Sequence, residues 1–203
     1  MNKNNTAGLN VLSLFDGMSA GMIALERAGI IVNKYYASEI DKHAIKVSQA
    51  NYPEIIRIGD VTKVSYADGL LTTENGKFYV GKIDLVIGGS PCQSISNMGD
   101  GSGLEGKSGL FYHYLRILDE VKPTKFLLEN VVGNKAAIAA ITREMGVQPT
   151  LIDSNLVSAQ NRKRYYWTDI NGVSQPADKG ILLKDILEDS PSESSVLSES
   201  RLR

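Results

Sequence analysis

The sequence predicts an α/β protein in which a mostly parallel sheet is covered by helices on both faces. Short, β-rich apolar runs alternate with helical patterns along the chain. The runs are almost continuously apolar, which is typical of strands that are buried on both sides. With 203 residues, 42% of them hydrophobic, the chain is long enough for one well-packed core and short for two domains.

Each element follows from a local pattern. The expected strands are residues 10–15, 34–39, 55–60, 83–89 and 125–130, with two more β segments at 148–155 and 164–170 at the far edge. The expected helices are residues 19–29, 41–52, 109–123 and 134–146, the third ending before Pro123 and the fourth at Gly146. An insertion at 69–82 contains Asn75-Gly76 and is interpreted as a hairpin of low consequence.

Composition narrows the class of protein. A single cysteine cannot form an internal disulfide, and the polar start of the chain has no apolar run typical of a signal peptide. No segment approaches the roughly 20 apolar residues of a membrane span. We therefore expect a cytoplasmic protein of a bacterial or phage-infected cell. The formal charge of −1 predicts no general attraction to nucleic acid, so any DNA contact would come from local clusters.

Acidic residues follow consecutive strands. Asp16 lies with Gly17 and Gly21 in the turn after the first strand, Glu39 ends the second, and Asp60 ends the third. Ligands bind at the carboxyl ends of parallel strands, and an acid at the second strand commonly binds ribose hydroxyls. Taken alone, the glycine turn fits a plain tight βα turn equally well, and Glu39 is better explained as an acid that complements the dipole at a helix N-terminus. As a set they favour one adenosine-type ligand with a cationic amino-acid end.

Cys92 follows the fourth strand in the segment "GGSPCQS", residues 88–94. A lone cysteine is more often an inert buried residue than a nucleophile. Here it lies just beyond the carboxyl end of a strand, after a narrow turn that is stiffened by Pro91. A glycine-rich loop follows it. This position favours a nucleophile over a buried apolar role.

Two further clusters complete the pattern. Glu129 and Asn130 end the fifth strand, where a carboxylate can serve as a general acid or bind a substrate ring, although an ordinary strand-end acid is the plainer interpretation. Arg162, Lys163 and Arg164 form the densest basic cluster and have tyrosines beside them. Such a cluster suits phosphate or base contacts, and a solvated basic turn is its usual explanation.

Taken in order, these motifs resemble the C5-cytosine DNA methyltransferase family. "FDGMSAG" (15–21) is similar to the family's S-adenosylmethionine motif, "GGSPCQS" to its proline–cysteine motif, "ENV" (129–131) to its glutamate motif and "QNRKR" (160–164) to its Q-x-R-x-R motif. The resemblance covers about residues 10–170 and extends to phage-borne and eukaryotic de novo enzymes. It implies the class I S-adenosylmethionine-dependent methyltransferase fold, a Rossmann-like doubly wound, mostly parallel sheet with an antiparallel edge strand.

The resemblance also implies a role for each matching residue. The cofactor S-adenosyl-L-methionine, which leaves as S-adenosyl-L-homocysteine, would be bound by Phe15, Asp16, Gly17, Gly21, Glu39, Ile40, Asp60, Val61, Gly89, Pro91 and Leu110. Cys92 would attack C6 of a flipped-out cytosine, Glu129 would bind N3, and Arg162 and Arg164 would contact the flipped nucleotide. Gln93, Ser94, Asn130 and Gln160 would join the arginines against double-stranded DNA. No metal is expected.

One departure from the family pattern affects the domain prediction. Residues 1–175 are expected to form the catalytic domain and residues 176–203 a serine-rich, disordered tail. Nothing after Arg164 resembles the family's target-recognition region or the asparagine-containing element that returns to the cofactor pocket. We therefore expect a truncated form, or one subunit of a split enzyme whose second chain supplies the rest.

The sequence is also compatible with other functions. The main alternative is a catalytically incompetent methyltransferase-like module that binds a cofactor or a partner. The intact Cys92, Glu129 and arginines weigh against it, and the missing recognition region weighs for it. A small-molecule methyltransferase would leave "PCQ" and "QNRKR" without a purpose, and a Rossmann oxidoreductase is disfavoured because G-x-G-x-x-G is missing.

Overall fold

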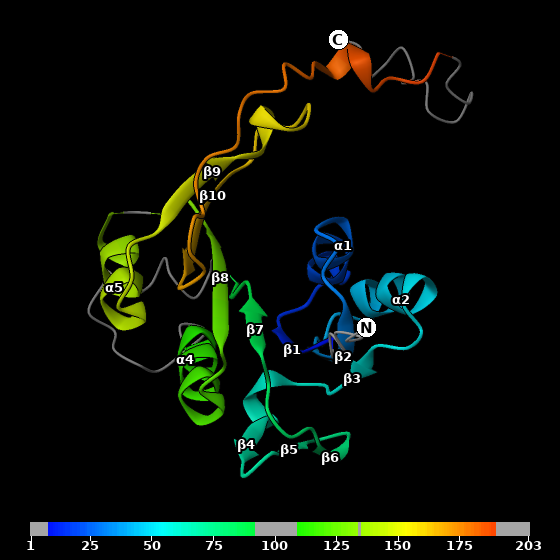
Figure 1. The fold of residues 1–203 in the computed structure, drawn as a ribbon, viewed down its shortest axis with the longest axis vertical. Coiled ribbons are helices and arrows are strands. Elements are labelled where there is room, and N and C mark those ends of the chain that lie inside the picture. Colours follow the sequence, from blue (N-terminus) through cyan, green and yellow to red (C-terminus); the bar gives the residue numbers. More distant parts are fainter. Residues whose placement is uncertain (1–7, 92–108, 134, 190–203) are drawn as a thin grey trace, which may run out of the picture.

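The computed structural model describes residues 8–91, 109–133 and 135–189, which form a seven-stranded sheet flanked by helices and a separate three-stranded sheet (Figure 1). The large sheet contains β1 (Leu9–Leu14), β2 (Val32–Ser38), β3 (Ile56–Arg57), β7 (Leu85–Gly88), β8 (Lys125–Val131), β9 (Thr150–Asp153) and β10 (Lys163–Thr168). The helices are α1 (Ala20–Arg27), α2 (Lys42–Asn51), α4 (Gly109–Val121) and α5 (Lys135–Met145), with short 3-10 turns η1 (Val61–Lys63), η3 (Ser154–Leu156) and η4 (Leu183–Asp185).

The strand order confirms the predicted fold class. The order is β3-β2-β1-β7-β8-β10-β9, and every pairing from β3 to β8 is parallel. β10 is antiparallel to both of its neighbours, so the antiparallel strand lies one place inside the edge and β9 is outermost. The winding reverses between β1 and β7, where open α/β sheets bind their ligands. β3 is shorter than expected because only Ile56 and Arg57 pair with β2.

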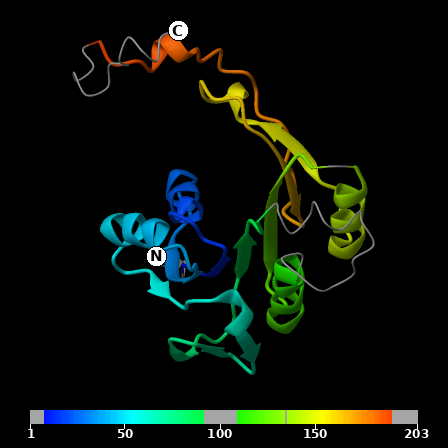
Figure 2. The same ribbon diagram turned by 180° about the vertical axis from the view of Figure 1, so that it is seen from behind.

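Side chains that alternate along the strands build a core on each face of the sheet. On one face Val11, Tyr35, Ala37 and Leu85 pack with Leu25 of α1. On the opposite face the intervening residues join a larger core with α4 and α5, which includes Leu12, Leu14, Tyr36, Val86, Phe111, Tyr114, Ile117, Leu128, Ile141 and Trp167. Figures 1 and 2 show α1 and α2 on one side of the sheet and α4 and α5 on the other.

Local signals explain where the helices begin and end. Asp41 caps α2, because its carboxylate accepts hydrogen bonds from the backbone N–H groups of His43 and Ala44, both at 2.8 Å. These bonds lower the pKa of Asp41. In α4 the buried residues Phe111, Tyr114, Ile117 and Val121 recur at helical spacing, and the helix ends just before Pro123, as predicted.

The insertion between β3 and β7 contains one strand more than predicted. Strands β4 (Ser65–Ala67), β5 (Leu70–Thr73) and β6 (Gly76–Tyr79) form an antiparallel sheet. Thr73 pairs with Gly76, so the tight turn consists of Glu74 and Asn75, one residue earlier than the Asn-Gly pair suggested. This shift places Glu74 against the end of β3, with consequences for the site.

Beyond β10 the chain leaves the sheet and runs alongside the β9–β10 pair before projecting from the rest of the molecule (Figures 1 and 2). The backbone N–H of Lys179 donates to the carbonyl of Leu156 at 2.8 Å, which ties this segment to η3. Further on, four exposed apolar residues lie in and beside η4: Leu182, Leu183, Ile186 and Leu187. Among the described helices none is long and apolar enough to span a bilayer.

Candidate active site

A cavity of about 230 Å³ opens at the carboxyl ends of β1, β2, β3 and β7, next to the point where the winding reverses. Its lining residues are Phe15, Ser38, Glu39, Ile40, Asp60, Val61, Gly89, Pro91 and Leu110. All of them except Ser38 belong to the predicted cofactor set, although they come from segments that are far apart in the chain. Ser38 was missed because sequence reasoning considered only the acid that follows it, whereas its hydroxyl donates to the carbonyl of Gly59 at 2.7 Å.

The turn after β1 adopts a conformation that few residues tolerate. Phe15, Gly17 and Ser19 all have positive φ angles, of 58°, 60° and 63°. The backbone N–H of Asp16 donates to the carbonyl of Ser38 at 3.0 Å, which attaches the turn to the end of β2. The Asp16 carboxylate accepts hydrogen bonds from the hydroxyls of Tyr35, at 2.8 Å, and Ser19, at 2.5 Å. Both of its oxygens are therefore bound within the protein.

Glu39 joins two backbone segments at the mouth of the cavity. Its Oε2 accepts a hydrogen bond from the N–H of Gly17 at 2.7 Å. Its Oε1 accepts from the N–H groups of Ile40 and Asp41, at 2.8 and 2.9 Å. A carboxylate has about four acceptor positions, so one position remains for a hydroxyl donor. The side chain thus orders the cavity wall and can still accept a ligand hydrogen bond.

Asp60 lies at the third strand end and is braced by the small sheet. Its carboxylate accepts from the N–H of Thr62 at 2.9 Å, and its own N–H donates to Glu74 Oε1 at 2.7 Å. Glu74 also pairs with Lys63 at 2.6 Å, which lowers the pKa of Glu74. The insertion was expected to be of low consequence, but its turn holds one wall of the cavity.

Gly21 lies away from the cavity, in the first turns of α1. A Cβ at this position would lie 2.3 Å from Ile87 Cδ1 and 2.8 Å from the Tyr35 hydroxyl. The missing side chain therefore leaves room for α1 to approach β7 and for Tyr35 to reach Asp16. Its predicted place in the cofactor set stays a prediction, with packing as the role that the geometry supports.

The ends of β7, β8 and β10 bring a second group of predicted residues together. Arg164 Nε lies 2.8 Å from Glu129 Oε1, and the two side chains are 17% and 27% exposed. The contact is an ion pair only, because the Nε–H has no hydrogen-bond acceptor among the described residues. A Cβ on Gly89 would lie 3.2 Å from Glu129 Oε2, so the segment after β7 passes directly beside this carboxylate.

Asn130 was expected at DNA, and the structure buries it to 2% exposure. Its Nδ2 donates to the carbonyl of Ser90 at 3.0 Å and to the Ser90 hydroxyl at 3.2 Å. Its Oδ1 accepts from the N–H of Val131 at 2.8 Å. The buried amide therefore anchors the segment that continues through Pro91 to Cys92, and this geometry suits positioning more than a direct DNA contact.

The remaining nucleic-acid candidates lie on and around the turn between β9 and β10. Gln160 and Arg162 are exposed there, and the N–H of Arg162 donates to Asp153 at 3.1 Å. Tyr166 faces Glu129 across the β8–β10 pair, and burial together with this carboxylate raises the pKa of Tyr166. Cys92, Gln93 and Ser94 lie outside the described residues.

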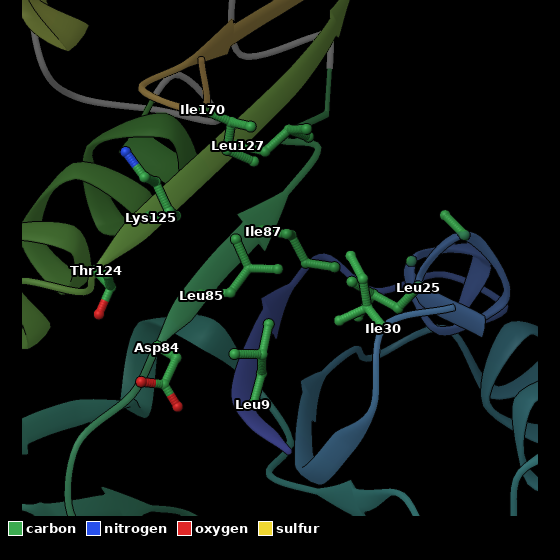
Figure 3. Close-up of a pocket in the computed structure, with 12 residues that line it drawn as sticks. Leu9, Leu25, Ile30, Asp84, Leu85, Ile87, Thr124, Lys125, Leu127 and Ile170 are labelled. Carbon is green, nitrogen blue, oxygen red and sulfur yellow. The ribbon is translucent and has the colours of Figure 1, made fainter. Parts of the chain in front are cut away.

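A second, larger cavity lies on the α1 face of the sheet, away from the acidic strand ends. It measures about 410 Å³ and is lined mainly by apolar side chains of β1, α1, β7 and β8. Figure 3 shows Leu9, Leu85 and Ile87 facing Leu25 and Ile30, with Asp84 and Lys125 toward one end. Its walls have few polar groups to orient a reactant. The first cavity, which Glu39 and Asp60 line and which is called the acidic cavity below, is therefore the better candidate site. The described residues contain no metal-binding cluster of three or more His, Cys, Asp or Glu.

Comparison with known proteins agrees with this geometry. Relatives include an orphan methyltransferase of Bacillus phage SPR, 35% identical over 78% of this chain and 37% of its own length. A type II methyltransferase of Neisseria gonorrhoeae is 30% identical over 96% of this chain and 50% of its own length. A rice DNA (cytosine-5)-methyltransferase of the DRM type is 38% identical over 64% of this chain and 28% of its own length. The chain thus spans half or less of the length of these relatives.

Among solved structures, an E. coli prophage-encoded protein described as a DNA modification methyltransferase has a TM-score of 0.60 and 24% identity, over 79% of this chain and 46% of its own. That likeness concerns the fold. The family profile of C-5 cytosine-specific DNA methylases matches residues 9–175, which include every described strand of the large sheet and both groups of strand-end residues. The chain therefore belongs to the C-5 cytosine-specific DNA methylase family.

Proposed function

We propose that this chain is the catalytic portion of a DNA (cytosine-5)-methyltransferase that transfers a methyl group from S-adenosylmethionine to cytosine in double-stranded DNA. One observation carries the proposal: the acidic cavity and the Glu129–Arg164 pair lie at the same edge of the sheet. The segment that leads to Cys92 lies between them, because Gly89 lines the cavity and passes beside Glu129. Because the chain spans half or less of its relatives, activity also requires polypeptide that reads the DNA, continuous with this chain or supplied by a second one.

The residues around the cavity fit an adenosine group. The apolar side chains of Phe15, Ile40, Val61 and Leu110 provide walls for a flat ring, and Glu39 and Asp60 provide acceptors for hydroxyl and amine donors. Bound S-adenosylmethionine would supply an electrophilic methyl group. Gly89 and Pro91 line the same cavity, so the segment that carries the nucleophile also forms a wall of the cofactor site.

Cytosine C5 is a weak nucleophile, which explains the need for the thiol. The Cys92 thiolate adds to C6 of a cytosine that has been flipped out of the duplex, and the electron pair of the C5–C6 bond becomes available at C5. C5 would then take the methyl group as its bond to the sulfonium sulfur breaks, and S-adenosylhomocysteine would be released. Loss of the C5 proton to a base restores the C5–C6 bond and expels the thiolate. Glu129 stabilises the ring during addition through N3, and its charge is balanced by Arg164.

The test is covalent trapping on duplex DNA containing 5-fluorocytosine, because fluorine at C5 cannot leave as a proton does. The chain is assayed with S-adenosylmethionine, alone and together with the recognition region of a phage relative as a separate chain. We expect an adduct that Cys92→Ser abolishes. Cofactor binding without an adduct in either mixture would favour a catalytically incompetent binding module, and failure to bind cofactor would contradict the proposal.

A further inference from the structure

A chain of hydrogen bonds runs behind the acidic cavity and ends at Asp16. Its members come from the turn after β1 and from β2, α2 and β3, and are here called the Asp16 chain: Asp16, Ser19, Tyr35, Ser48 and Arg57. Ser19 Oγ lies 2.6 Å from Ser48 Oγ, and Arg57 Nη2 donates to Ser48 Oγ at 2.9 Å. Ser19, Tyr35 and Ser48 are 0%, 4% and 2% exposed, so water does not replace these bonds readily.

The two ends of the chain determine the direction of every proton in it. A guanidinium only donates and an ionised carboxylate only accepts. Ser19 must therefore use its single hydroxyl proton on Asp16, and Ser48 must donate to Ser19 while it accepts from Arg57. Tyr35 donates to the second carboxylate oxygen. Burial and the nearby carboxylate raise the pKa of Tyr35, which keeps its hydroxyl a donor.

The chain also balances charge across the fold. Among the residues that the structure describes, no carboxylate lies within ion-pair distance of Arg57. Its guanidinium contacts the carbonyls of Ile55 and Tyr52, at 2.9 and 3.2 Å, and then Ser48. The two serine hydroxyls thus connect a partly buried cation to the Asp16 carboxylate, with each bond polarising the next.

We infer that the Asp16 chain positions residues 15–19 for the cofactor, and that Asp16 acts as a positioning residue whose carboxylate does not contact the ligand. This rests on the proposed function. The turn needs such support because it contains three residues with positive φ, two of them not glycine. It also presents Phe15 to the cavity and the Gly17 N–H to Glu39, so its order is transmitted to both.

Asp16→Asn is the most informative variant because it keeps the size of the side chain. Ser19 and Tyr35 donate to different oxygens of Asp16, and an amide has only one oxygen. One of the two hydroxyl donors would therefore face the amide N–H group instead of an acceptor. Ser48→Ala breaks the chain at a distance from the cavity. Thr142→Val is the matched control, because it removes an acceptor of one part-buried hydrogen bond, from Trp167 Nε1 at 3.0 Å, on the opposite face of the sheet.

Two measurements separate this inference from the proposed function. In hydrogen exchange without cofactor, we expect Asp16→Asn and Ser48→Ala to speed exchange over residues 15–20 by about ten-fold or more, and Thr142→Val to leave it unchanged. In calorimetry with S-adenosylmethionine, the dissociation constant should rise by about ten-fold for the first two and by less than about two-fold for the control.

Unchanged exchange in Asp16→Asn would overturn the positioning role, whatever the affinity. Faster exchange with unchanged affinity would also overturn it, because the turn would then be ordered without serving the ligand. If the unmodified protein binds no S-adenosylmethionine while hydrogen exchange responds as expected, the proposed function is contradicted. The Asp16 chain would then order residues 15–19 without a role in cofactor binding, and the second half of the inference would be overturned. If Asp16→Asn does not fold, the Ser48→Ala results decide the matter alone.

Discussion

The two sides of the site are held together in different ways. On the side proposed for the cofactor (the cofactor side), at the ends of β1, β2 and β3, carboxylates accept hydrogen bonds from backbone N–H groups of tight turns. On the side proposed for the target base (the base side), at the ends of β7, β8 and β10, side chains contact distant segments, as in the Glu129–Arg164 and Asn130–Ser90 pairs. The comparison indicates that the first side is ordered by bonds between carboxylates and the backbone of the same or neighbouring turns, whereas the second depends on contacts between side chains and segments of separate strands.

The largest effect is expected on the cofactor side, from Glu39→Ala. This change removes the acceptor of three backbone N–H groups. Hydrogen bonds to a charged group are stronger than those between neutral groups, whereas the exposure of two of the three bonds to solvent weakens them. We therefore expect a loss of about 3 kcal/mol in the free energy of unfolding. Urea unfolding measures it. The exposed Glu54→Ala is the control, and equal stability of the two variants would contradict the comparison.

An intermediate effect is expected on the base side, from Asn130→Ala. The change leaves the buried carbonyl of Ser90 and the part-buried N–H of Val131 without their partner, which should cost about 2 kcal/mol. It also frees the segment before Cys92. Since Cys92 is the only cysteine, its alkylation by iodoacetamide reports on this segment alone, and we expect the rate to rise by about ten-fold.

Asn155→Ala serves as the exposed control for that experiment. It should change neither the unfolding free energy nor the alkylation rate. An Asn130→Ala variant that is destabilised but alkylated at the original rate would show that the amide stabilises the sheet without holding the Cys92 segment.

The smallest stability effect is expected from Glu129→Gln. Its ion pair with Arg164 remains partly open to solvent and makes no hydrogen bond through Nε, so its loss should change the free energy of unfolding by less than about 1 kcal/mol. The 5-fluorocytosine adduct should nevertheless be lost. Glu144→Gln, which breaks the exposed pair with Arg143, should leave the free energy of unfolding and the 5-fluorocytosine adduct unchanged. A large destabilisation by Glu129→Gln alone would mean that the pair is structural.

Much of the fold was predictable because its signals are local. The helix at α4 follows from its apolar spacing and from Pro123, and the parallel strands follow from their continuous apolar runs. Glu39 and Asp60 were predictable for the same reason, since acids that end consecutive parallel strands must meet at one edge. Most of the other residues that line the cavity were expected only from the resemblance to the family. The part that sequence reasoning missed lies in side-chain direction: Asp16 turns inward to Tyr35, and Asn130 turns inward to Ser90.

The sequence by itself determined the family, through its motifs and their order. It also determined the edge of the sheet at which the motifs gather, because hydrophobic period, turn residues and chain order set that feature. Only the tertiary structure decided which polar atoms are free. Hydrogen-bond partners such as Glu74 for Asp60 and Ser48 for Ser19 come from other elements, and no spacing along the chain specifies them. A buried polar group must be paired, so packing settles whether a strand-end residue faces a ligand or holds the residues that do.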